Sequence, residues 1–135
     1  MKKFAALGVT LLLILGFAIA GCGKSAGTGS TSGGTHTSIG MTGNNFDTHT
    51  FSAKTGQAVL FTNTIGGGGY HIVCIGTGNG GTNTCDASGN GPTNLYGSGI
   101  TFNSGETQNI TFATAGTYHV ICTVHPGMYV DITVS

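Results

Sequence analysis

The sequence predicts an all-β domain, a sandwich or barrel of seven or eight short strands. Val, Ile, Phe and Tyr recur in short alternating runs, turn residues separate these runs, and none of them has helical periodicity. Only 6% of the 135 residues are charged and 26 are glycine. That composition alone would suit a low-complexity chain, but the alternating runs favour a Gly- and Thr-rich β domain. The length suffices for one domain with a modest core.

The expected strands lie between residues 38 and 134 and are rich in residues that favour extended structure. They are Ser38–Thr42, Phe46–Ala53, Ala58–Thr62, Tyr70–Ile75, Ile100–Phe102, Gln108–Phe112, Tyr118–Cys122 and Tyr129–Val134. Gly, Asn and Ser mark most of the turns between them. The stretch Gly76–Gly99 is long, polar and rich in Gly and Asn, so we expect it to be a loop.

The N-terminus has the layout of a secretory signal peptide, residues 1–21. Lys2 and Lys3 precede an apolar run, residues 4–20, that is short for a membrane span. The following tetrapeptide Ile-Ala-Gly-Cys, which ends at Cys22, resembles a bacterial lipobox, in which cleavage leaves an acylated cysteine. We therefore expect an exported protein, anchored through lipidated Cys22 to the outside of the bacterial cytoplasmic membrane or in the periplasm. The alternative is plain cleavage, with Cys22 as an incidental thiol.

Residues 22–37 form a second segment, composed almost wholly of Gly, Ser and Thr. Such a segment buries nothing and behaves as a flexible tether with a reach of about 20 Å. We expect the folded domain to occupy residues 38–135.

The few charges exclude one class of partner. All four basic residues, Lys2, Lys3, Lys24 and Lys54, lie in the first 54 positions, and the formal net charge is +0. Without a basic patch we expect no nucleic-acid partner, and electrostatic steering of any partner should be weak. We expect a monomer.

The heptapeptide Cys122-Thr-Val-His-Pro-Gly-Met128 carries the strongest functional signal. It spaces a thiolate, the imidazole of His125 and a thioether three positions apart. Thiolate, two imidazoles and a weak axial thioether form the donor set of blue-copper electron-transfer sites. From composition, this spacing arises by chance with a probability of about 0.003. The alternative is a buried Cys and a core-filling Met without any metal.

Strand parity indicates the fourth donor. His119 lies three positions before Cys122 and therefore points to the other face of its strand, while His49 has no sulfur near it in sequence. We expect both to be surface histidines. His71 opens a strand directly after a glycine-rich loop, where a side chain can reach a site built by a later loop. The sequence thus predicts one copper ion held by His71, Cys122, His125 and Met128.

Four cysteines in an exported protein would ordinarily form two disulfides. We expect a different division, with Cys22 lipidated, Cys122 on the metal and Cys74 bonded to Cys85. Parity agrees, because Cys74 lies three positions after His71 and faces away from the metal side. The rival pairing of Cys74 with Cys122 would destroy the site.

These segments together resemble the cupredoxins, the type 1 blue copper proteins, over about residues 38–135. The similarity is strongest in Gly-Thr-Tyr-His-Val-Ile-Cys-Thr-Val-His-Pro-Gly-Met, and the Cys-x₂-His-x₂-Met spacing is that of the short amicyanin loop. The segment from Phe51 to Asn63, followed by Tyr70-His71, is similar to the part that leads to the family's first histidine ligand.

The resemblance implies an eight-stranded Greek-key β-sandwich with His71, Cys122 and His125 as equatorial ligands and Met128 as the axial one. It also implies that redox partners dock near His125. One position departs from the pattern: many cupredoxins have Asn after the first histidine, where its side chain ties the two ligand segments together, and this chain has Ile72.

The leading hypothesis is therefore a membrane-tethered one-electron carrier that cycles Cu(II)/Cu(I), and not an enzyme. A copper storage or delivery lipoprotein could use the same ligands. Two further alternatives are a metal-free adhesive surface domain and a domain related to copper oxidases or nitrite reductases. A chain of this length has no second histidine cluster for a catalytic copper.

Overall fold

The computed structural model describes residues 37–66, 68–78 and 80–135. The predicted signal peptide (1–21), the lipidated Cys22 and the tether up to residue 36 lie outside the described residues. Among those described, no helix is long and apolar enough to cross a membrane.

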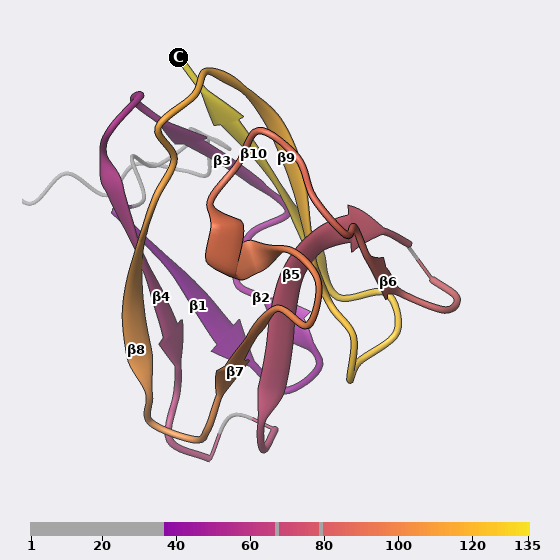
Figure 1. Cartoon of the computed structure of the whole chain (residues 1–135). Coiled ribbons are helices and arrows are strands. Elements are labelled where there is room, and N and C mark those ends of the chain that lie inside the picture. Colours follow the sequence, from indigo (N-terminus) through magenta and orange to yellow (C-terminus); the bar gives the residue numbers. More distant parts are fainter. Residues whose placement is uncertain (1–36, 67, 79) are drawn as a thin grey trace, which may run out of the picture. The chain divides into compact units, whose positions relative to one another are not determined.

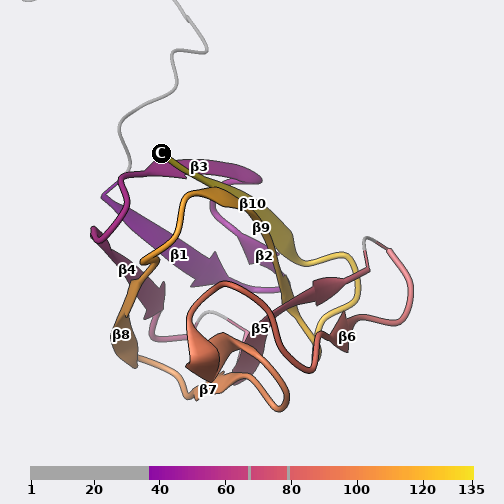
Figure 2. The same ribbon diagram turned by 45° about the horizontal axis from the view of Figure 1, so that its top comes forward.

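In the described part of the chain, ten strands form two packed sheets (Figures 1 and 2). The first sheet has the order β2-β1-β4-β8, and the second has the order β3-β10-β9-β5-β6, with β7 also paired to β5. The strands are β1 (Ser38–Thr42), β2 (Asn45–Phe46), β3 (Thr50–Ala53), β4 (Ala58–Asn63), β5 (His71–Thr77), β6 (Thr84–Cys85), β7 (Ile100–Phe102), β8 (Thr107–Thr111), β9 (Gly116–Cys122) and β10 (Tyr129–Val134). The described residues contain no α-helix, only a 3₁₀ turn at Thr93–Leu95.

The predicted fold class is confirmed, because neighbouring strands are mostly distant in sequence, as in a Greek-key sandwich. Strand β1 runs parallel to β4, and β10 runs parallel to β3 on one side and antiparallel to β9 on the other. Such neighbours need connections that cross between the sheets. The two strands beyond the expected eight, β2 and β6, have only two residues each.

Alternating burial along the strands builds the core. Strands β1, β4 and β10 bury every second side chain, as one-sided packing requires. Phe61 is fully buried and its ring meets Phe46 edge to face at a centroid distance of 6.4 Å. Phe102 lies 6.3 Å from Phe61 across the two sheets. This aromatic layer fixes the spacing of the sandwich below the candidate site.

Two of the predicted elements were wrong in detail. Residues 46–53 do not form one strand: the Asp47 amide bonds the Gly40 carbonyl at 2.9 Å, and the chain then leaves the first sheet for the second. Burial changes phase at the break, because Phe46 is buried before it while Phe51 and Ala53, an odd number of positions later, are buried after it. The stretch Gly76–Gly99 is not all loop, since β6 pairs with β5 and the 3₁₀ turn buries Leu95 completely.

Candidate metal centre

Strand pairing brings the predicted ligands from distant parts of the chain to one place. Val73 of β5 lies opposite Cys122 of β9, and the Thr123 amide donates to the Ile72 carbonyl at 2.9 Å. Cys122, the last residue of β9, therefore lies two positions along the pairing from His71, the first residue of β5, and on the same face of the sheet.

The three nitrogen and sulfur donors form a compact triangle. Cys122 Sγ lies 3.7 Å from His71 Nδ1 and 3.6 Å from His125 Nδ1, and the two nitrogens are 3.1 Å apart. A point in their plane lies about 2.0 Å from all three, close to metal–imidazole distances of about 2.0–2.1 Å and slightly short of a metal–thiolate bond of about 2.3 Å. Three lone-pair donors face one another here, an arrangement that a cation stabilises. The geometry fits one soft or borderline metal ion.

Burial differs among the four predicted ligands. His71, Cys122 and Met128 are fully buried, whereas His125 keeps part of its surface exposed. The Met128 side chain packs into the core cluster at the end of the ligand loop. Its place on the axis of the site stays a prediction.

Backbone hydrogen bonds close the ligand loop tightly. The Met128 amide donates to the His125 carbonyl at 3.2 Å, and the Cys122 amide donates to the Met128 carbonyl at 3.0 Å. Pro126 and Gly127 occupy the two central positions of the turn that the bond from Met128 to His125 closes, and Gly127 has a φ of 80°. Proline followed by a residue with positive φ is the signature of a type II turn. The Pro-Gly pair thus sets the short distance between the histidine and the methionine.

The other two histidines of the described chain, His49 and His119, lie outside the triangle, as expected. His49 is exposed, and its Nδ1 lies 3.1 Å from the Tyr129 carbonyl oxygen. His119 bonds Asp131 through Nδ1 at 2.6 Å and the Gly78 carbonyl through Nε2 at 3.1 Å. Both of these partners are acceptors, so a protonated ring satisfies both.

The pKa of His119 is raised above its usual value. Burial, the largest influence, lowers this pKa, but the hydrogen bonds to Asp131 and the Gly78 carbonyl, with the charges of Asp131 and Asp86, together outweigh it. His119 thus links β9 to Asp131 of β10 and to the Gly78 carbonyl just after β5.

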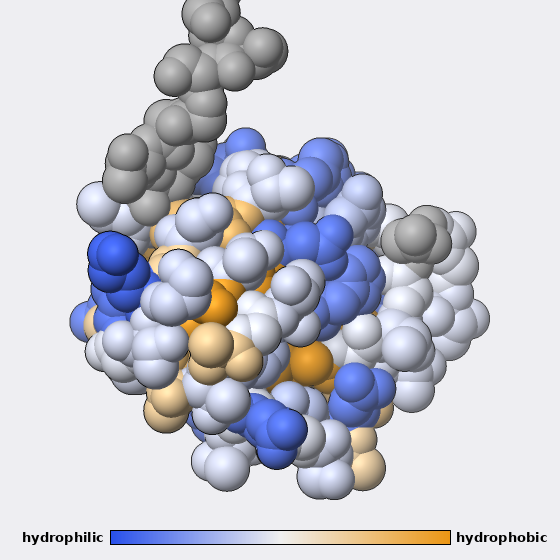
Figure 3. Space-filling view, turned by 90° about the horizontal axis from the view of Figure 1, so that it is seen from above, coloured by the Kyte–Doolittle hydropathy of each residue, from blue (hydrophilic) through white to orange (hydrophobic). Residues whose placement is uncertain are grey.

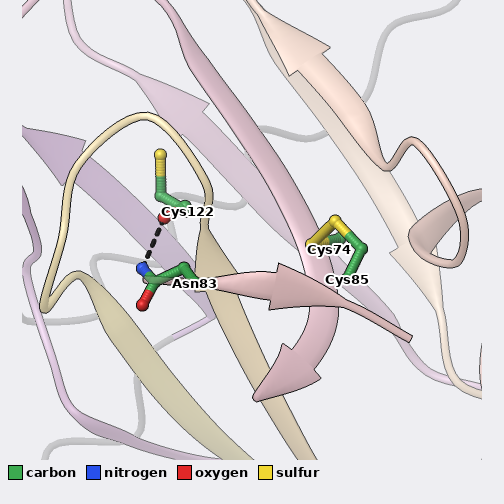
Figure 4. The surroundings of a disulfide bond; sticks show 4 residues. All are labelled: Cys74, Asn83, Cys85 and Cys122. Atoms are coloured by element: carbon green, nitrogen blue, oxygen red, sulfur yellow. Dashed lines mark hydrogen bonds between the residues drawn. A yellow bond between two sulfur atoms is a disulfide. The ribbon is translucent and has the colours of Figure 1, made fainter. Parts of the chain in front are cut away.

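The expected disulfide is present: Cys74 and Cys85 are bonded, and Cys122 is a free, buried thiol. Figure 4 shows the bridge on the far side of β5 from the Cys122 sulfur. Since Cys74 pairs with Ile121 while Val73 pairs with Cys122, the two sulfur atoms point to opposite faces of the sheet. The rival pairing of Cys74 with Cys122 is excluded.

Sequence reasoning missed two asparagines that hold the site. Asn63 is fully buried at the end of β4, and its Nδ2 donates to the carbonyls of Gly69 at 2.8 Å and Phe102 at 3.1 Å, which fixes the loop entering His71. Asn83 Nδ2 donates to the Cys122 carbonyl at 2.6 Å. An Asn at a strand end before a glycine loop could have indicated the first, because such side chains often bond nearby backbone. Nothing local indicates the second.

A family model for copper binding proteins of the plastocyanin/azurin family matches residues 34–135. The chain belongs to this family. Its copper cofactor follows from the family together with the donor set, which fits one type 1 copper per chain. Comparison with curated proteins finds no match for this cupredoxin.

Solved structures share the fold. Amicyanin from Paracoccus versutus is 21% identical, with 78% of this chain and 86% of that chain covered and a TM-score of 0.54. A reduced Cu(I) form of an amicyanin mutant is 22% identical, with 73% and 80% covered and a TM-score of 0.52. A copper-containing nitrite reductase from Thermus scotoductus is 24% identical with a TM-score of 0.51. In the last pair 73% of this cupredoxin matches only 22% of the larger enzyme chain.

Proposed function

We propose that this cupredoxin is a membrane-tethered one-electron carrier that uses His71, Cys122, His125 and Met128 as copper ligands. The observation that supports it best is the unequal burial of these four residues, since only His125 has exposed surface. A site closed on every side but one lets an electron pass through one ligand while solvent stays out. Bound copper supplies a one-electron Cu(II)/Cu(I) couple.

The chain's own residues keep the site rigid. Cys122 ends one strand, His71 begins its neighbour, and the turn between His125 and Met128 is closed by hydrogen bonds. Ligands held this firmly change little between the two oxidation states of a metal, which favours fast transfer over substrate turnover. We therefore propose a carrier and not an enzyme.

Partner docking near His125 is part of this proposal. Ile65 and Tyr70 are the exposed large hydrophobic residues of the described chain, 85% and 53% exposed, and both belong to the β4–β5 loop that leads into His71. Figure 3 looks onto the opposite end of the domain, where β10 ends, and orange areas there are small and separated by pale and blue surface. Tyr70 directly precedes His71, and exposed apolar side chains of this kind suit brief electron-transfer encounters.

Anchoring through Cys22, with residues 22–37 as a tether, is proposed from the sequence. A lipid-held carrier would range over the membrane surface between membrane-bound partners. Replacement of Cys22 by Ala should release the protein from the membrane fraction without changing its copper site. Retention of the variant in that fraction would contradict the anchor.

The copper site is tested with the full chain and Cu(II). We expect one copper per chain, a strong visible thiolate-to-copper band, and reversible loss of the band on addition of one electron per copper. Cys122→Ser and His71→Ala should abolish the band, while the control His49→Ala should keep it. A colourless, folded wild-type protein would refute the proposal. A coloured protein that surrenders its copper on each reduction would favour storage or delivery.

A further inference from the structure

We propose that Asn83 positions the copper-ligand loop through hydrogen bonds from its side chain. The apolar side chain of Ile72 cannot tie the ligand segments together in this way. This inference rests on the proposed copper site and adds a residue that is 39 positions away from Cys122 in sequence. Ile72 has an apolar side chain, so only its carbonyl, which accepts from Thr123, ties the two ligand segments.

The Asn83 amide clamps two ligand residues at once. Its Nδ2 lies 2.6 Å from the Cys122 carbonyl oxygen (Figure 4). The same nitrogen lies 3.4 Å from the His125 carbonyl oxygen. Because carbonyls only accept, the NH₂ side of the amide must face them. These two carbonyls flank the turn that carries the thiolate and the exposed imidazole. One side chain therefore fixes the spacing of both donors from outside the loop.

Asn83 can do this only because its own backbone is held in place. Two residues later, Cys85 is bonded to Cys74 and pairs with Gly76 in the β5–β6 ladder. A Cβ added at Gly76 would collide with the Thr84 carbonyl oxygen. The close approach of β6 to β5, and with it the reach of the clamp, depends on that glycine.

A second glycine admits the side chain itself. Gly78 has a φ of 134°, and a Cβ there would collide with Asn83 Oδ1. The Gly78 carbonyl also accepts from His119, which holds this end of the hairpin against β9. In the polar segment after β5, here called the strap, the Cys74–Cys85 disulfide holds Asn83 in place, and the Asn83 side-chain amide holds the ligand loop. Outer partners of this kind orient metal ligands.

A copper-free measurement tests the clamp. Cys122 is fully buried, so a thiol reagent reaches it only when the loop opens. In the metal-free full chain, Asn83→Ala should raise the alkylation rate of Cys122 about fivefold through loss of the hydrogen bond. Peptide mass spectrometry reads Cys122 separately from Cys22. Asn83→Asp should raise the rate further, because a carboxylate cannot donate and repels the carbonyls.

The matched control is Asn109→Ala, an exposed asparagine on β8 of the other sheet. Equal alkylation rates in Asn83→Ala and Asn109→Ala would overturn the proposal. An equal rise in the hydrogen-exchange rate of the buried Phe61 amide would also overturn it, because Asn83 would then stabilise the whole domain and not the loop. Asn83→Ser, too short to bridge both carbonyls, replaces the Ala variant if that variant does not fold.

A second readout separates this inference from the proposed function. In the copper-loaded protein, Asn83→Ala should weaken copper affinity by about tenfold or more and shift the thiolate-to-copper band, while Asn109→Ala changes neither. Suppose that the wild type binds no copper, but Asn83→Ala accelerates Cys122 alkylation and Asn109→Ala does not. The proposed electron-carrier function is then wrong, while the proposed role of Asn83 is supported. If the wild type binds copper and Asn83→Ala changes neither the alkylation rate nor the copper site, the proposed role of Asn83 is wrong, while the electron-carrier function remains supported.

Discussion

Removal of the Cys74–Cys85 disulfide should destabilise the metal-free protein by about 3 kcal/mol. The two residues are 11 apart in sequence, and closing a loop of that length restricts the unfolded chain by about this free energy at 25 °C. Cys74→Ala/Cys85→Ala should therefore lower the melting temperature by about 10 °C or more. Urea unfolding followed by circular dichroism measures the free energy, and it is done without copper because a bound ligand would add its own stabilisation.

Wild-type protein under reductant is the matched control and should lose the same stability as the double variant. The bridge also holds Asn83, so Asn83→Ala should accelerate Cys122 alkylation less in the double variant than in the wild type, as expected for coupled residues. A loss of less than about 1 kcal/mol would show that the β5–β6 hairpin stays folded without the bridge. Full additivity of the two changes would show that the bridge does not position the amide.

Two further predictions concern the same strap. Because the folded-state pKa of His119 is raised, its ion pair with Asp131 stabilises the fold below the ordinary histidine pKa of about 6.5, and this contribution disappears as the pH rises through the higher folded-state pKa. Both side chains are partly exposed, so the effect is small. Between pH 6 and pH 9 the free energy of unfolding, measured with urea, should fall by up to about 1 kcal/mol more in the wild type than in His119→Gln. An equal fall in the two proteins would contradict the role of His119. Gly76→Ala should cost about 1–3 kcal/mol, because its Cβ meets the Thr84 carbonyl, whereas Gly81→Ala, with open space around it, should stay within about 0.5 kcal/mol in the same assay. Equal losses in the two glycine variants would contradict the close packing of β6.

Local pattern was sufficient for most of the site. The spacing within the loop from Cys122 to Met128 is a property of seven consecutive residues, and the alternation of strands assigned His119 and Cys74 to faces away from the metal. Short-range periodicity survives folding because each strand packs one face inward. The triangle of Cys122, His71 and His125 donors agrees with that reasoning.

The pattern of neighbouring residues gave a wrong strand prediction where the two halves of one segment pair with different sheets. We predicted one strand over residues 46–53, yet the buried positions change phase between Phe46 and Phe51, and the chain changes sheets between β2 and β3. The polar stretch after β5 has no periodicity at all, and its strand β6 exists because a disulfide and a side-chain amide fix it from outside.

The sequence by itself determined the all-β class and the soft donor set of the Cys122–Met128 loop, and it predicted the pairing of Cys74 with Cys85. These features depend on residue type and on spacings of a few positions, which the chain fixes before it folds. Only the tertiary structure decided how the ligand loop is fastened. The contact between Asn83 and the Cys122 carbonyl spans 39 residues and exists only after β5, β6 and β9 have paired. No local property of Ile72 or Asn83 encodes that contact.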